Sequence, residues 1–132
     1  MNGRLFGLIT LILVIVLALR LVVNMAARGL RSKGKKLPAW LGGLNRLLNR
    51  IHRYVGIAAT ITVLIHLLWM WTAIGRPSIS GLAASFFLLL QATSGLGMLR
   101  RKGEDRRKIA RAHTIIGAGL VIAVIVHRLP GL

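Results

Sequence analysis

Four long apolar runs, separated by polar and basic stretches, dominate the pattern of residues along the chain. They cover about residues 4–27, 52–74, 81–99 and 112–129. Each run approaches the roughly 20 apolar residues that a helix needs to cross a hydrocarbon core about 30 Å thick. Too little of the 132-residue chain remains outside these runs for a separate soluble domain of ordinary size. The pattern therefore predicts an all-α protein, a single transmembrane four-helix bundle formed by residues 1–132.

A shorter helical pattern precedes the second apolar run. In residues 39–51, apolar side chains such as Leu41, Leu44 and Leu48 recur at helical spacing among polar ones such as Asn45 and Arg46. An amphipathic stretch of this kind is typical of a helix that lies in the membrane interface. We therefore expect a short cytoplasmic amphipathic helix between the first and second spans.

The third apolar run contains several small and weakly polar residues. Gln91, Thr93, Ser94, Gly95 and Gly97 lie close together in its second half. Small residues allow membrane helices to approach closely, and weakly polar side chains form hydrogen bonds between helices. This group is therefore assigned to helix packing.

The charge of the chain is strongly positive and is concentrated between the apolar runs. The formal net charge is +17, with Glu104 and Asp105 as the only acidic residues. The basic residues form two blocks, which is the positive-inside pattern of membrane proteins and argues against nucleic acid as a partner. We expect a multi-pass protein of the cytoplasmic (inner) membrane, surrounded by lipid, with both basic connections cytoplasmic and both termini outward. The two blocks are Arg28, Arg31, Lys33, Lys35, Lys36, Arg46, Arg50 and Arg53, and then Arg100, Arg101, Lys102, Arg106, Arg107, Lys108 and Arg111.

Two absences from the sequence narrow the chemistry. The chain has no cysteine, which excludes disulfides, iron–sulfur ligation and covalent c-type haem attachment through this chain. No aspartate or glutamate lies inside an apolar run, so a carboxylate relay for protons within the membrane is excluded as well.

An internal repeat supplies the candidate chemistry. The second span reads HRYVGIAATITVLIH and the fourth reads HTIIGAGLVIAVIVH. In both spans two histidines are fourteen residues apart, and a glycine follows the first histidine by four residues. The repeated residues are His52, Gly56 and His66 in the second span, and His113, Gly117 and His127 in the fourth.

Helix geometry gives this spacing a meaning. Fourteen residues are close to four turns, so both histidines of a span project from nearly the same face, about 21 Å apart along the axis. Both spans follow a basic connection, so they are expected to run in the same direction. Their histidines then fall at matching depths, as an inner pair, His52 with His113, and an outer pair, His66 with His127.

Each facing pair of imidazoles can occupy both axial positions of a haem iron. Iron ligated in this way has no open position for oxygen, which favours electron transfer. Gly56 and Gly117, one turn from the inner histidines, are expected to leave room for the flat ring. The repeat thus predicts two b-type haems with His52, His113, His66 and His127 as iron ligands. For one histidine alone, a hydrogen bond to a neighbouring helix is an equally good explanation.

The histidine spans carry a resemblance to a known group of proteins. The HRYVG start, the His66-Leu67-Leu68-Trp69 end and the HTIIG start resemble the small membrane modules of di-haem cytochrome b families, which include ferric-reductase-like domains. The resemblance covers about a third of the chain. It implies an electron-transfer subunit of a respiratory or redox complex, with redox partner subunits and quinone as its partners. The chain lacks the additional helices and the nucleotide-binding domain of larger members, so their oxidoreductase activity does not carry over.

Arginines next to the candidate ligands fit the same interpretation. Arg53 follows His52, and Arg128 follows His127. Haem propionates are anionic, and a charge-assisted contact with a guanidinium would stabilise the cofactor. Arg53 and Arg128 are therefore predicted to contribute to cofactor binding. Other cations are available near the inner pair, namely Arg111, Arg50 and Arg20, and near the outer pair, namely Arg76.

Two other functions stay open at this stage. One is a stand-alone membrane reductase that acts on quinone or ferric ions at an exposed haem edge. The other is a haem-free assembly or metal-transport subunit whose histidines bind Zn²⁺ or pack helices. A closed zinc site needs several ligands close together, whereas the two pairs here are expected to lie most of a bilayer apart.

Overall fold

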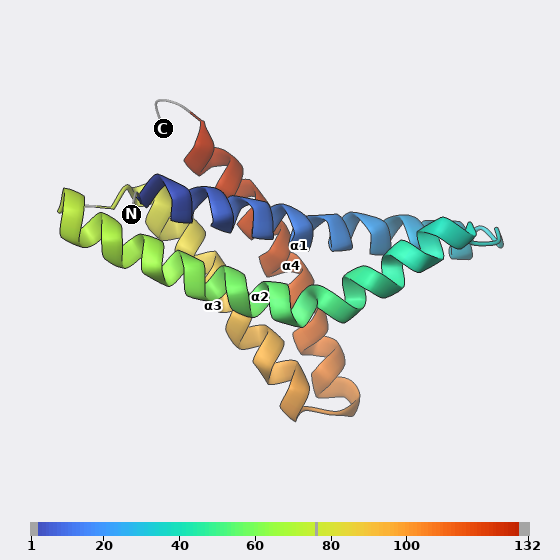
Figure 1. Cartoon of the computed structure of the whole chain (residues 1–132). Helices are drawn as coiled ribbons and strands as arrows, with labels where there is room; N and C mark the ends of the chain where they lie inside the picture. Colours follow the sequence, from blue (N-terminus) through green and yellow to red (C-terminus); the bar gives the residue numbers. More distant parts are fainter. Residues whose placement is uncertain (1–2, 76, 130–132) are drawn as a thin grey trace.

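Four helices make up the part of the chain that the structure, a computed structural model, describes, namely residues 3–75 and 77–129 (Figure 1). Each helix is long and apolar enough to cross a membrane. The prediction of an all-α protein with four membrane-spanning helices is therefore confirmed, and the chain is a multi-pass membrane protein. The helices are α1 (Gly3–Ser32), α2 (Ala39–Ile74), α3 (Ile79–Arg100) and α4 (Gly103–Arg128).

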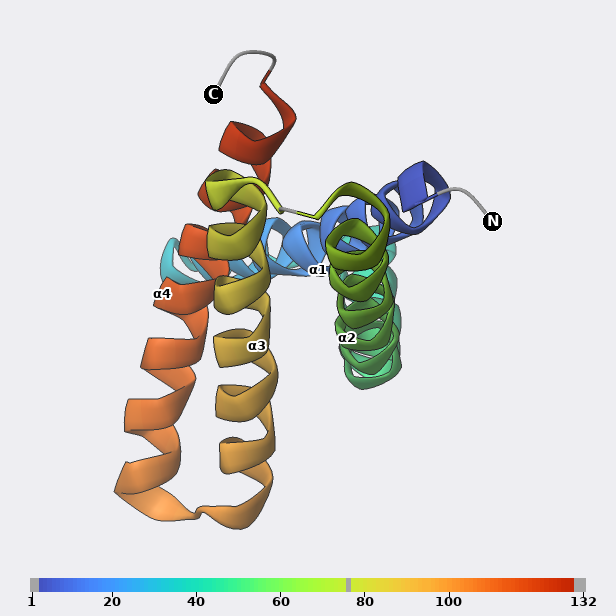
Figure 2. The ribbon, with the colours of Figure 1, turned by 90° about the vertical axis from the view of Figure 1, so that its left-hand side faces the viewer.

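The helices form two hairpins that cross each other (Figures 1 and 2). α1 packs along α2, and α3 packs along α4, while smaller contacts join α2 to α3 and α1 to α4. The start of α1, the end of α2, the start of α3 and the end of α4 gather at one end of the molecule (Figure 1). The two basic connections lie away from that end and apart from each other, the first at the right and the second at the bottom of Figure 1. α2 and α4 therefore run in the same general direction, as the positions of the basic blocks predict.

The prediction of a separate amphipathic helix is wrong. Residues 39–51 are the first turns of the continuous helix α2, and their apolar side chains pack against α1. Leu41 and Leu48 are 6% and 4% exposed in a cluster with Val23. α1, with 30 residues, is about 45 Å long and so extends past a core of about 30 Å. The last turns of α1 therefore provide the surface against which the apolar side chains of residues 39–51 pack, whereas these side chains were expected to lie on lipid.

Local signals in the sequence explain the tight turn between the hairpins. Gly75, with φ of 77°, ends α2 in the left-handed conformation that glycine adopts without strain. Three residues later the hydroxyl of Ser78 accepts a hydrogen bond from the backbone N–H of Gly81, which caps the start of α3. These two caps bring α3 back antiparallel to α2.

An apolar layer contributed by all four helices separates the two levels of histidines. In α2 the layer lies between His52 and His66, and in α4 it lies between His113 and His127. The polar groups of each level are thus kept apart by closely packed aliphatic side chains. The buried members of this layer are Val14, Ala59, Val63, Leu88 and Leu120.

Candidate functional site: two levels of paired histidines

The structure brings the predicted inner pair together. The ring centres of His52 and His113 lie 6.1 Å apart, with the ring planes nearly perpendicular at 85°. Among the described residues, no Cα atom of α2 lies within 8 Å of a Cα atom of α4. The two helices therefore lie diagonally across the bundle, and the imidazoles extend across the space between them.

This separation is compatible with a metal ion ligated by both rings. Each metal–imidazole bond is about 2 Å, so two rings on opposite sides of one ion have centres roughly 6 Å apart. The Nδ1 atom of His52 is buried and has no hydrogen-bond partner among the described residues. A buried polar atom left unpaired costs about 1–3 kcal/mol, and such an atom requires a specific explanation. A bound ligand at this level would provide one.

Residues of α3 hold both ring nitrogens of His113. The hydroxyl of Ser94 lies 2.8 Å from Nδ1, and the side-chain amide nitrogen of Gln91 lies 3.0 Å from Nε2. The same amide would lie 3.0 Å from a Cβ placed on Gly117, whereas a Cβ on Gly56 would meet nothing within 4 Å. Gln91 thus occupies the position beside Gly117 that was expected for a flat cofactor. Its amide must turn away before Nε2 can accept a metal ion.

The outer pair has similar surroundings. The hydroxyl of Ser80 lies 3.2 Å from Nδ1 of His127, and the Ser78 hydroxyl lies 3.5 Å away. His66 is near enough to His127 to act on it electrostatically. A Cβ placed on Gly7 of α1 would lie 3.3 Å from Cε1 of His66, so this ring lies directly against α1. The inner rings are therefore brought together, and the outer rings lie close enough to act on each other electrostatically.

The cation at the inner level comes from α1. Arg20 acts electrostatically on both His52 and His113. Its Nε donates a hydrogen bond to Oδ1 of Asn49 at 2.8 Å, which fixes the guanidinium near the rings. Arg53 is exposed, and it is Arg20 rather than Arg53 that acts on the inner rings. Arg128 is also exposed but acts on the adjacent His127, and Arg76 lies outside the described residues.

Gln91, Ser94 and Gly95 of α3 were assigned only to helix packing, yet all three lie against His113. Ser80 and Gly81 were given no role at the site, yet both lie against His127. The sequence contains a pattern that could have identified the serines and glycines, because Ser-Gly-Leu occurs at residues 80–82 and again at residues 94–96. The two copies are fourteen residues apart, which is also the spacing of the histidines.

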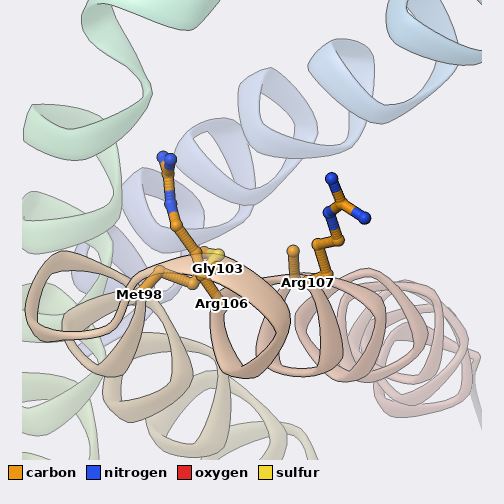
Figure 3. A pocket seen from close by; sticks show the side chains of 5 residues that line it. Met98, Gly103, Arg106 and Arg107 are labelled. Carbon is orange, nitrogen blue, oxygen red and sulfur yellow. The ribbon is translucent and has the colours of Figure 1, made fainter.

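A pocket at the basic end of the molecule lies apart from the histidines. It is lined by Met98, Gly103, Arg106, Arg107 and Ala110 at the connection between α3 and α4 (Figure 3). None of these residues is a histidine or an acid, so the pocket offers cationic and apolar groups only. The candidate redox site is therefore the pair of histidine levels rather than this pocket.

The spans and their arrangement define the class of the protein, a multi-pass membrane protein with paired histidines on α2 and α4. No family model, curated protein or solved structure matches the chain. The likeness to di-haem cytochromes b therefore stays a prediction from the short motifs in α2 and α4.

Proposed function

We propose that the chain is an electron-transfer protein that holds two b-type haems between α2 and α4. His52 and His113 ligate the inner haem iron, and His66 and His127 ligate the outer one. One observation carries the proposal: imidazoles of two diagonal helices face each other at 6.1 Å, and a second pair lies fourteen residues along both helices. Random placement of single histidines does not produce two matched levels.

The residues around each level have distinct roles in this proposal. A bound haem supplies a reversible one-electron change at its iron. Two imidazole ligands leave that iron without an open position, which favours electron transfer over oxygen activation. Arg20 at the inner level and Arg128 at the outer level are the cations that would pair with propionate groups.

The orientation follows from the charge of the connections. Both basic connections lie away from the end at which α2 and α4 finish, and positive residues favour the cytoplasmic side. The inner level then lies toward the cytoplasm of a cell bounded by this membrane, and both termini lie outside. Redox partner subunits or quinone would deliver and remove electrons at the two faces.

The metal-transport alternative has weaker support. In the described part of the chain, no three His, Cys, Asp or Glu side chains converge on a possible metal position. A closed zinc site normally has four ligands, and each level here offers two. A stand-alone reductase would be favoured instead by rapid turnover of one small acceptor in the absence of any partner.

Haem content of the detergent-purified protein tests the proposal. We expect a pyridine haemochrome assay to give two b-type haems per chain. His52→Ala and His113→Ala should each remove the same haem, and His66→Ala and His127→Ala should each remove the other. The exposed Tyr54→Phe, two residues from His52, serves as the control that keeps both. A preparation without Soret and α-bands contradicts the proposal, as does a haem whose loss pairs histidines of different levels.

A further inference from the structure

α3 carries the same tripeptide twice, once at each histidine level. Ser80-Gly81-Leu82 and Ser94-Gly95-Leu96 are fourteen residues apart, which matches the interval between His127 and His113. Because α3 and α4 are antiparallel neighbours, equal intervals bring each copy to one histidine. The contacts repeat accordingly: each serine hydroxyl lies at an Nδ1 atom, and each glycine lies against a Cε1 atom.

Hydrogen-bond donors at the inner level determine which ring nitrogen of His113 carries the proton. The hydroxyl of Ser94 donates its single hydrogen to the backbone carbonyl of Gln91 at 3.0 Å. With that hydrogen on the Gln91 carbonyl, Ser94 Oγ offers a lone pair to Nδ1, 2.8 Å away, and Nδ1 is the donor in this arrangement. In a neutral imidazole this leaves the lone pair on Nε2, and the Gln91 amide N–H, 3.0 Å from Nε2, donates to it.

The glycines allow each ring to lie against the backbone of α3. A Cβ placed on Gly95 would lie 3.5 Å from Cε1 of His113, and one placed on Gly81 would lie 3.1 Å from Cε1 of His127. A Cβ on Gly81 would be close enough to displace the His127 ring, whereas one on Gly95 would only touch the His113 ring at an ordinary contact distance. Each glycine therefore lets the ring lie next to the serine that holds its Nδ1 atom.

We propose that the two Ser-Gly pairs of α3 are positioning residues for the histidines of α4. Each serine holds Nδ1 of its histidine in place, and at the inner level Ser94 keeps the proton of His113 on Nδ1, which leaves Nε2 as the nitrogen for a metal ion. Metal-ligating histidines generally donate their other N–H to a fixed acceptor, and this contact orients the ring. The role of Nε2 as an iron ligand rests on the proposed function, whereas the protonation of the ring does not.

Nitrogen NMR of the full-length, haem-free protein with ¹⁵N-labelled histidine tests the proposal directly. In the unaltered chain we expect the Nδ1-protonated form for His113. Ser94→Ala should convert it to a mixture of both forms while His127 stays unchanged, and Ser94→Thr, which keeps the hydroxyl, should restore it. Ser85→Ala is the matched control, because Ser85 is a buried serine of α3 whose hydroxyl donates to the carbonyl of Gly81.

A second measurement separates this inference from the proposed function. On haem-loaded protein, Ser94→Ala should weaken haem retention at the inner level by about 10–100-fold and leave the outer level unaffected. Unchanged His113 ring signals in Ser94→Ala, or an equal change in Ser85→Ala, overturn the inference even if two haems bind. A tautomer change in a protein that binds no haem supports the positioning role and overturns the proposed function.

Discussion

At the residue scale, the glycines next to the imidazoles lie on the neighbouring helices α1 and α3, not on the helices that carry the histidines. Gly7, Gly81 and Gly95 lie on α1 and α3, whereas the sequence repeat singled out Gly56 and Gly117 on the histidine helices. The physical reason is that a histidine side chain extends away from its own helix. Space is needed where the ring arrives, so the neighbouring helix must be the one without a Cβ atom.

The two glycines of α3 that lie against histidines, Gly81 and Gly95, should differ in their tolerance of alanine. A Cβ on Gly81 would lie 3.0 Å from Ser78 Oγ and 3.1 Å from His127 Cε1, which forces the ring or the cap to move. A Cβ on Gly95 would lie 3.5 Å from His113 Cε1, an ordinary contact. We expect Gly81→Ala to reduce the haem content of the outer level and Gly95→Ala to leave the inner level nearly unchanged. Equal losses in a haemochrome assay would contradict this order.

If the proposed inner haem is bound, Arg20 should raise its potential. Reduction removes one positive charge from the iron, so a neighbouring guanidinium favours the reduced form. At an effective dielectric constant near 20, a nearby unit charge contributes on the order of 1 kcal/mol, or about 50 mV for a one-electron change. Arg20→Gln should therefore lower the midpoint potential of the inner haem by that amount in a redox titration. The exposed Arg53→Gln is the control, and a larger shift from Arg53→Gln than from Arg20→Gln would refute the assignment.

At the element scale, the first turns of α2 pack against α1. Substitutions of two adjacent leucines in these turns should therefore have different effects on stability. Leu48 is 4% exposed in the cluster with α1, whereas Leu47 is 53% exposed. Leu48→Ala should destabilise the protein by about 2–5 kcal/mol through lost burial and the resulting cavity. Leu47→Ala should have little effect on the melting temperature in detergent. A separate helix on the membrane surface would predict small and similar effects of the two substitutions.

The four spans and the histidine pairs could be predicted because both depend on spacing along single helices. Apolar length identifies a span, and a fourteen-residue interval places His52 and His66 on one face regardless of how the helices pack. The continuation of α2 through residues 39–51 could not be predicted in the same way. An apolar stripe looks the same whether it meets lipid or α1, and only the packing of Leu48 on α1 decides.

The partners of the histidines were harder to predict for a related reason. Ser94 and Gly95 have the composition of any membrane helix contact, so their packing role was the natural first interpretation. Their function depends on the register between α3 and α4, which composition does not determine. The two copies of Ser-Gly-Leu in α3 have the same fourteen-residue interval as the two histidines of α4, which indicates how the two helices align. A comparison of repeats between different helices would have revealed this alignment.

At the scale of the whole molecule, the two levels and the apolar layer between them form one continuous arrangement. Fourteen residues of helix separate the levels by about 21 Å along each axis. The layer that contains Val14, Ala59 and Leu120 fills the middle of the bundle mainly with aliphatic side chains. Under the proposed function, transfer of an electron from one face to the other requires both levels, because neither alone extends across the hydrocarbon core.

Vesicles that contain the purified protein can test this requirement. With ferricyanide enclosed and dithionite added outside, the unaltered chain should consume the internal oxidant, because electrons pass through both levels. His52→Ala and His66→Ala each remove one level, so each should stop the transfer although one haem remains visible in the spectrum. Tyr54→Phe should transfer at the unaltered rate. A single-level variant that still transfers electrons at that rate would show that the levels act independently, and the proposed path through the membrane would then be wrong.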